Sequence, residues 1–251
     1  MGHLANVLIR LVLPAALIGL WQVASTSGWV NPVFVPPPDR VARTGYEMLT
    51  GGDLIPAAAA TTGRALLGLA IAIVIAVPAG LVFASSRLAD GLTYPAREFF
   101  RALPTVTIVP ALMVIVGPGE SLSVLAVVFG AVWPILLGTI LGVRETDRVL
   151  LDVARVHRLS ARRAVVKIRL PAALPQIMTG IRISLAIALV IALVVEMMSG
   201  HGGLGSMVVE ARSRFRNTEV FAIVAVIGVV GLVLNALMVR IERRTRHDVP
   251  A

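Results

Sequence analysis

The chain has 251 residues, of which 57% are hydrophobic, and its 23 Lys and Arg outnumber 14 Asp and Glu to give a net charge of +9. The hydrophobic residues gather in blocks, which argues against a soluble domain and predicts a membrane protein. In such a protein the excess of Arg indicates topology, so we expect no nucleic-acid binding. With no Cys and four His, we also expect no disulfide, no metal site and no cofactor bound by this chain.

Six apolar segments predict six membrane-spanning helices, because a helix needs about 20 mostly apolar residues to cross the hydrocarbon core. The expected spans cover residues 7–24, 65–84, 103–116, 121–141, 181–198 and 220–239. The third segment is short and contains Pro104 and Pro110, so five spans remain the alternative if it is re-entrant. The expected fold is an all-α polytopic bundle that forms one domain over residues 1–251.

The N-terminal part of the chain predicts a retained span followed by an irregular connector. Trp21 is typical of an interfacial anchor, which favours a membrane span over a cleaved signal peptide. Residues 36–38 are three consecutive prolines, which predict extended chain. Residues 40–50 have the pattern of a short amphipathic helix.

The basic residues predict the orientation in the membrane. An even number of spans places both termini on one side, and positive charge favours the cytoplasm. The C-terminal cluster comprises Arg240, Arg243, Arg244 and Arg246. We therefore expect cytoplasmic termini, and the same alternation makes the basic connector 142–180 cytoplasmic. An outer loop with Arg212, Arg214 and Arg216 runs against this pattern without reversing it.

The connector 142–180 is longer than a simple link between helices needs. Val149, Val153 and Val156 recur with helical spacing. A second helix is expected after Ser160, a suitable N-cap, and is expected to stop at Pro171. The residues alone allow two interpretations: a charged helix–turn–helix that docks on a partner, or a solvated hairpin that binds nothing.

This connector resembles a known family motif. Asp152, Val153 and Ala154, then Arg158, then Ile168, Leu170 and Pro171 stand at the same spacings as the "EAA" loop of binding-protein-dependent ABC transporter permeases. Residues 104–110, 133–135 and 196–205 are similar to the branch of that family that serves nitrate, sulfonate and taurine importers.

The resemblance implies a type I importer permease in a bacterial inner membrane, with no enzymatic activity of its own. ATP and Mg²⁺ would bind a separate ATP-binding cassette subunit, since this chain has no Gly-rich phosphate loop of the G-x-x-x-x-G-K-[ST] kind. An extracytoplasmic binding protein would deliver a small polar solute, and a second copy or a homologous permease would complete the channel. The residues that the resemblance assigns to coupling are Asp152, Val153, Ala154, Arg155, Arg158, Ile168, Leu170 and Pro171.

Arg158 is the main departure from the family pattern, which has Gly at this turn. A non-Gly residue in the left-handed conformation costs about 1–2 kcal/mol. Either the turn is built differently here, or the cation has a use at an interface. The departure leaves a homodimer and a heterodimer of permeases equally open.

Glu196 is the only acidic residue inside an expected span, and an ionisable group there is a functional hypothesis by default. Its place near the outer end favours a structural or gating role over contact with substrate. The expected path or gate residues are Glu196, Met197, Gly203, Leu204 and Gly205. A membrane-embedded enzyme is the alternative, but the spans offer Glu196 no His or Asp partner. A stand-alone secondary transporter would normally show internal repeats.

Overall fold

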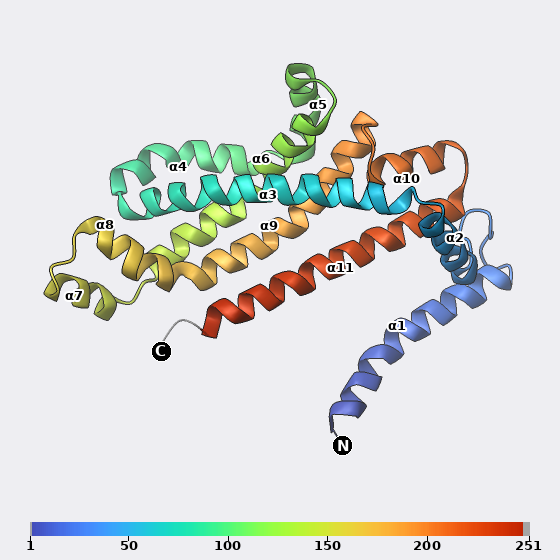
Figure 1. Cartoon of the computed structure of the whole chain (residues 1–251), viewed down its shortest axis with the longest axis horizontal. Helices are drawn as coiled ribbons and strands as arrows, with labels where there is room; N and C mark the ends of the chain where they lie inside the picture. The colour runs from blue at the N-terminus through green and yellow to red at the C-terminus, as the bar shows by residue number, and fades with distance from the viewer. Residues whose placement is uncertain (1, 248–251) are drawn as a thin grey trace.

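Helices make up all the regular secondary structure in the part of the chain that the computed structural model describes. That part is the backbone of residues 2–247 and the side chains of residues 12–243, except those at positions 148, 153, 155, 161 and 162. The predicted all-α class is therefore confirmed. The elements in chain order are α1 (Gly2–Thr26), α2 (Pro38–Thr50), α3 (Leu54–Ser85), α4 (Arg87–Ala102), α5 (Thr105–Val116), α6 (Glu120–Arg144), α7 (Arg148–Val156), α8 (Ala161–Ala164), the π-helical turn η1 (Val165–Arg169), α9 (Leu170–Ser199), α10 (Leu204–Ser213) and α11 (Asn217–His247) (Figure 1).

Four described helical segments are long and apolar enough to cross a membrane, or five if one bent pair counts as a span. The four are Leu54–Ser85, Glu120–Arg144, Val165–Ser199 and Asn217–Arg243. The described apolar part of α1, Val12–Thr26, is shorter than a full span; the start of the expected span 7–24 lies outside the described side chains. The amphipathic helix expected at 40–50 is confirmed as α2.

The third expected span is broken. Helices α4 and α5 meet at an angle of 94°, and Leu103 and Pro104 between them are extended. Proline disfavours the helical conformation in the residue before it and supplies no N–H, so the chain turns here. The segment 103–116 therefore does not continue the line of the helix before it, and the break opens one side of the bundle.

Helix α6 lies at the centre of the bundle and packs closely against α3 and α9. Gly138 and Gly180 permit the close crossing of α6 and α9, because a Cβ at Gly138 would lie 2.7 Å from the Gln176 carbonyl oxygen and one at Gly180 would lie 2.6 Å from that of Pro134. Ser184 on α9 donates a hydrogen bond of 2.7 Å to the Ala131 carbonyl on α6. Small residues and interhelical hydrogen bonds hold membrane helices together where the hydrophobic effect gives little preference for protein over lipid.

The connector forms the two helices that were expected, but the expected stop at Pro171 is wrong. Helix α8 runs without a gap into η1, and η1 and α9 form one continuous helical segment, Val165–Ser199. Pro171 lies in the first turn of α9, directly after a π-type turn in which the Leu170 N–H bonds to the Val165 carbonyl. The wider turn changes the local hydrogen-bond register, and a proline in a first turn costs little.

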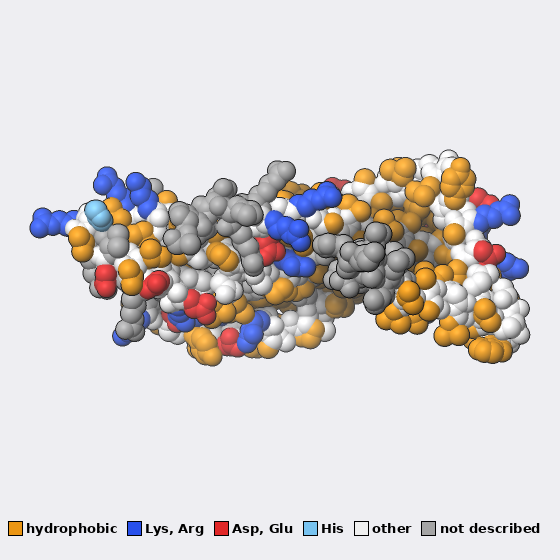
Figure 2. All heavy atoms as spheres, turned by 90° about the horizontal axis from the view of Figure 1, so that it is seen from below, with side chains coloured by type: hydrophobic (Ala, Val, Ile, Leu, Met, Phe, Trp, Pro, Cys, Tyr) orange, Lys and Arg blue, Asp and Glu red, His pale blue; other side chains and the backbone are white. Residues whose placement is uncertain are grey.

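The molecule is elongated, and its two ends differ in composition. Helices α7 and α8 lie at one end, near the end of α11, while α2 and α10 lie at the other (Figure 1). Lys and Arg side chains gather at the α7–α8 end, with hydrophobic side chains between them (Figure 2). Both ends contain residues that the sequence singled out.

Candidate functional site

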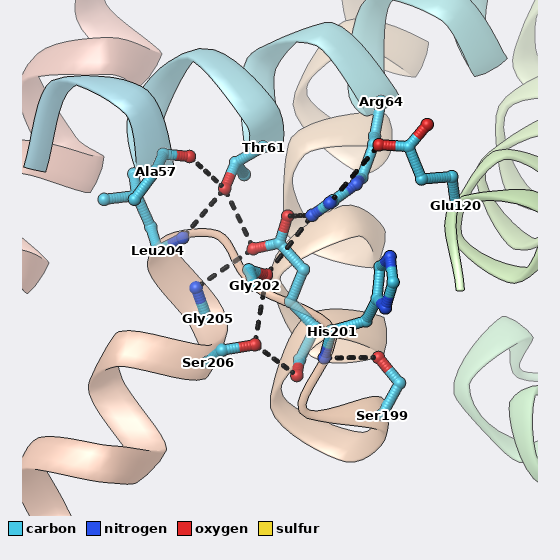
Figure 3. Close-up of polar contacts among 11 residues, drawn as sticks. Ala57, Thr61, Arg64, Glu120, Ser199, His201, Gly202, Leu204, Gly205 and Ser206 are labelled. Atoms are coloured by element: carbon cyan, nitrogen blue, oxygen red, sulfur yellow. Dashed lines mark hydrogen bonds and ion pairs between the residues drawn. The ribbon is translucent and has the colours of Figure 1, made fainter. Parts of the chain in front are cut away.

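Glu196 is fully buried near the C-terminal end of α9. Its Oε1 accepts a hydrogen bond of 2.8 Å from Arg64 Nη1. Its Oε2 lies 2.8 Å from the Thr61 hydroxyl, which donates to it, and 3.0 Å from the Gly205 N–H. Helix α3 and the start of α10 thus converge on the carboxylate at the end of α9 (Figure 3).

Arg64 on α3 supplies the positive charge that balances Glu196. Its side chain is only 9% exposed, and Nη1 also donates to the Gly202 carbonyl at 3.2 Å. The second ion pair, from Nη2 to Glu120, is longer at 3.6 Å and reaches a largely exposed carboxylate. A buried charge is stable only when it is paired and hydrogen-bonded, so Arg64 and Glu196 depend chiefly on each other.

The segment Gly203–Gly205 fits against this carboxylate. Gly203 has φ +94°, and a Cβ there would lie 2.4 Å from the Glu196 carboxylate. Leu204 is fully buried, and its N–H donates to Thr61 Oγ1 at 2.9 Å. Glu196 therefore binds the first turn of α10, where a negative charge is favoured by the free N–H groups and the helix dipole.

The residues Glu196, Gly203, Leu204 and Gly205, together with Thr61, Arg64 and Gly202, form what we call the Glu196 network. Met197 is not part of it, because its side chain is 40% exposed and makes none of these contacts. Sequence reasoning missed Thr61 and Arg64, because the second span was expected to begin at residue 65. A lone Arg beside a long apolar stretch was the available signal, since such a cation needs a buried partner.

At the opposite end, α7 and the turn after it form the start of the predicted coupling segment. Arg158 has φ +50°, and the Leu159 N–H bonds to the Ala154 carbonyl at 3.0 Å. These two features define a Schellman-type helix end. The turn expected for a Gly is thus present, with Arg158 in the strained left-handed conformation.

The described side chains of α7 leave apolar surface uncovered. Val149 and Val156 are 65% and 80% exposed, whereas Ala154 is buried. Asp152 is exposed, and the side chains of Val153 and Arg155 lie outside the described residues. Further along the segment, Ile168 and Leu170 are half-buried and Pro171 is exposed.

Arg144, at the C-terminal end of α6, leads into this segment and is tied to α4. Asp90 on α4 bonds to both Arg97 and Arg144, and the Arg97 guanidinium lies 4.9 Å from the centre of the Phe83 ring. The base of the coupling segment is therefore anchored to the bundle through the Arg144–Asp90 ion pair, and Asp90 is held in turn by Arg97, which stacks on Phe83.

Comparison with known proteins explains this combination of features. Residues 68–247 match the family model described as "Binding-protein-dependent transport system inner membrane component". The chain belongs to this family. It is accordingly the permease subunit of an ABC importer, which is a multi-pass membrane protein. The subunit has no enzymatic activity, because the ATPase of such an importer is a separate subunit. Members of the family work with ATPase and substrate-binding partners.

The relatives indicate the branch of the family. The chain is 31% identical to the aliphatic sulfonates transport permease protein SsuC of Bacillus subtilis, over 93% of this chain and 85% of that one. It is 27% identical to the taurine transport system permease protein TauC of Escherichia coli (92% and 86% covered) and 26% identical to the nitrate import permease protein NrtB of Leptolyngbya laminosa (99% and 92%).

A solved structure shares the fold. The inward-facing MetNI methionine ABC transporter matches with a TM-score of 0.68 at 20% identity, over 77% of this chain and 96% of that one. The architecture expected from the resemblance, a type I importer permease, is therefore confirmed, as is the nitrate, sulfonate and taurine branch.

Proposed function

We propose that this permease carries a small polar solute with an oxyanion group, of the kind represented by nitrate, sulfonates and taurine, into the cytoplasm. An extracytoplasmic binding protein delivers the solute, and ATP with Mg²⁺ is hydrolysed on partner ATP-binding cassette subunits. A second copy of this chain, or a homologous permease, completes the pathway. In this proposal both termini and the α7–α8 end are cytoplasmic, and the Glu196 network faces outward.

The coupling role rests on one observation: α7 presents exposed Val149 and Val156 beyond the bundle. In water such side chains lose the benefit of burial, about 1.5–3 kcal/mol each. Docking into an apolar cleft on the ATPase would recover it, and exposed cations around the patch, among them Arg158 and Lys167, would give the contact its orientation.

The transmission of force follows from how the segment is attached. The helical run Val165–Ser199 is continuous, so movement of the coupling residues Ile168, Leu170 and Pro171 passes directly into α9. At the other end of α9, Glu196 holds α3 and the first turn of α10. ATP-driven closure would thus shift the balance between inward-facing and outward-facing states by binding one of them better, with Glu196, Met197, Gly203, Leu204 and Gly205 at the gate.

The experiment is reconstitution of the complete transporter in proteoliposomes with its ATPase and binding protein. We expect uptake of radiolabelled taurine, nitrate or ethanesulfonate. It should require ATP on the side of the membrane where the ATPase lies, and it should stop when any component is omitted. Uptake by this chain alone, driven by an ion gradient without ATP, would contradict the proposal and support a secondary transporter.

A further inference from the structure

A groove of about 580 Å³ opens at the break between α4 and α5, along α6 and α9. Its position beside the broken span and the closely packed Gly138–Gly180 crossing puts it within the membrane-spanning bundle. Its lining residues are Arg101, Leu103, Pro104, Thr105, Gly130, Trp133, Pro134, Leu137, Gly138, Leu141, Gln176, Thr179, Gly180, Ile183 and Ile187.

The charge of this lining is one-sided. Among the described residues that line the groove, Arg101 is the only ionisable side chain, and none is acidic. A cation that entered would lose water, which is costly in an apolar setting, and the described lining has no carboxylate of its own, since Glu98, the partner of Arg101, lies outside it. An anion would meet a guanidinium, which suits oxyanions because its N–H groups form a planar fork.

A smaller cavity continues the groove and has the same bias. It shares Arg101 and Trp133 with the groove, and its charged lining consists of Arg97, Arg101 and Arg144 against Asp90 and Glu98. The balance is one positive charge in excess. A charged cleft with apolar walls raises the local concentration of ions of the opposite sign.

Arg101 and Thr105 have hydrogen-bond donors to spare. Arg101 Nη2 pairs with Glu98 at 2.5 Å, but both side chains are well exposed, at 48% and 38%, so the pair is weak and leaves the other guanidinium N–H groups for a ligand. The Thr105 hydroxyl, in the first turn of α5, has no hydrogen-bond partner among the described residues. It borders Gly130, where an added Cβ would lie 3.0 Å from it.

We infer that Arg101 and Thr105 are specificity-determining residues for passage of a small oxyanion through this groove. The inference rests on the proposed function and adds the residues that hold the solute on its way. One half-exposed cation and one hydroxyl bind loosely, which suits a pathway, because a solute that is held tightly does not leave.

The absence of Cys from the chain permits a direct test on the complete transporter in proteoliposomes. Thr105→Cys places one thiol in the groove, and two methanethiosulfonate reagents then probe it, the anionic ethylsulfonate and the cationic ethyltrimethylammonium. We expect Thr105→Cys to react about tenfold faster with the anionic reagent after correction for intrinsic reactivity, a preference of one ion contact. Phe34→Cys, which is exposed in the connection between α1 and α2 and is not part of the groove lining, corrects for that reactivity.

Substitution at Arg101 then tests whether its charge causes the preference for the anionic reagent. Arg101→Gln should abolish it and lower uptake of ethanesulfonate per ATP hydrolysed by about tenfold, while ATPase activity stimulated by the binding protein stays within about twofold. Arg101→Lys should retain most of both properties. Arg87→Gln, which removes an exposed Arg from the same helix outside the groove, should change neither.

Equal labelling by the two reagents, or wild-type transport in Arg101→Gln, would overturn the inference even when the wild-type transporter works. Failure of the wild-type transporter to take up taurine, nitrate or ethanesulfonate would instead contradict the proposed function, and the labelling preference would still test the groove.

Discussion

The Glu196 network and the α7 end of the coupling segment are opposite solutions to the placement of polar and apolar groups. The network buries a carboxylate and a guanidinium and supplies both with partners from the same chain. At α7, Val149 and Val156 are exposed and the turn holds Arg158 in a strained conformation. The first region finds its counter-charges within this chain, whereas in the proposed function the second gains its contacts from another molecule.

Among these variants, Glu196→Gln should lower the stability most, because it removes the negative charge of the Glu196 network. The amide keeps the shape of Glu196 but leaves the buried Arg64 with only its longer ion pair to the exposed Glu120, so we expect a loss of about 3–5 kcal/mol in the free energy of unfolding. The midpoint of SDS-induced unfolding in mixed micelles measures it. Adding Arg64→Gln should restore part of the loss; a double variant less stable than Glu196→Gln would show that the two charges are not coupled.

Gly203→Ala tests how closely the chain fits the carboxylate. At φ +94° and ψ 178° a side chain is strained, and its Cβ would also meet the carboxylate, so we expect a loss of about 3 kcal/mol. The matched control is Gly202→Ala, with φ +59° and open space around the added Cβ, which should cost only about 1–2 kcal/mol. Equal losses in the same unfolding assay would contradict the described packing.

Arg158→Gly tests the strain at the other end. Glycine adopts φ +50° without steric cost, and after its greater entropy in the unfolded chain is subtracted we expect a local gain of up to about 1 kcal/mol. Hydrogen exchange of the α7 amides should slow accordingly, while Arg158→Lys should leave it unchanged. If Arg158 also contacts the ATPase, uptake should fall in Arg158→Gly despite the gain in local stability. Faster hydrogen exchange of the α7 amides in Arg158→Gly would contradict the strained turn.

Glu210→Gln should have the smallest effect. Its ion pair with Arg214 is 2.8 Å long but more than half exposed on both sides, and such pairs contribute less than about 1 kcal/mol. The same SDS midpoint gives the value. A loss as large as that of Glu196→Gln would remove the distinction between buried and surface charges on which the comparison depends.

The sequence predicted best what depends on local pattern. The amphipathic helices α2 and α7 follow from hydrophobic periodicity, the spans α6 and α11 follow from continuous apolar stretches, and the spacing of the connector indicated the family. The stop at Pro171 was predicted wrongly because the rule that proline ends a helix assumes an α-helical register, which η1 alters. At Leu103–Pro104 the sequence predicted a short third span, with a re-entrant segment as the alternative, but not the sharp bend between α4 and α5.

Contacts between distant segments were beyond the sequence. Glu196 was singled out, but nothing in its neighbourhood along the chain identifies Arg64 or Thr61 as its partners, since α3 and α9 meet only after the bundle has packed. The exposure of Val149 and Val156 was equally hidden, because periodicity defines an apolar face without showing whether the chain covers it.

The central claim, that α7 is completed by the ATPase, is tested most directly by measuring how much ATPase subunit co-purifies with Val149→Asp/Val156→Asp from membranes that contain the whole transporter. We predict a loss of at least about tenfold, with the SDS unfolding midpoint unchanged. The control Val33→Asp, which changes a 65% exposed valine in the connection between α1 and α2, should capture the ATPase normally. Wild-type capture by the double variant would contradict the claim.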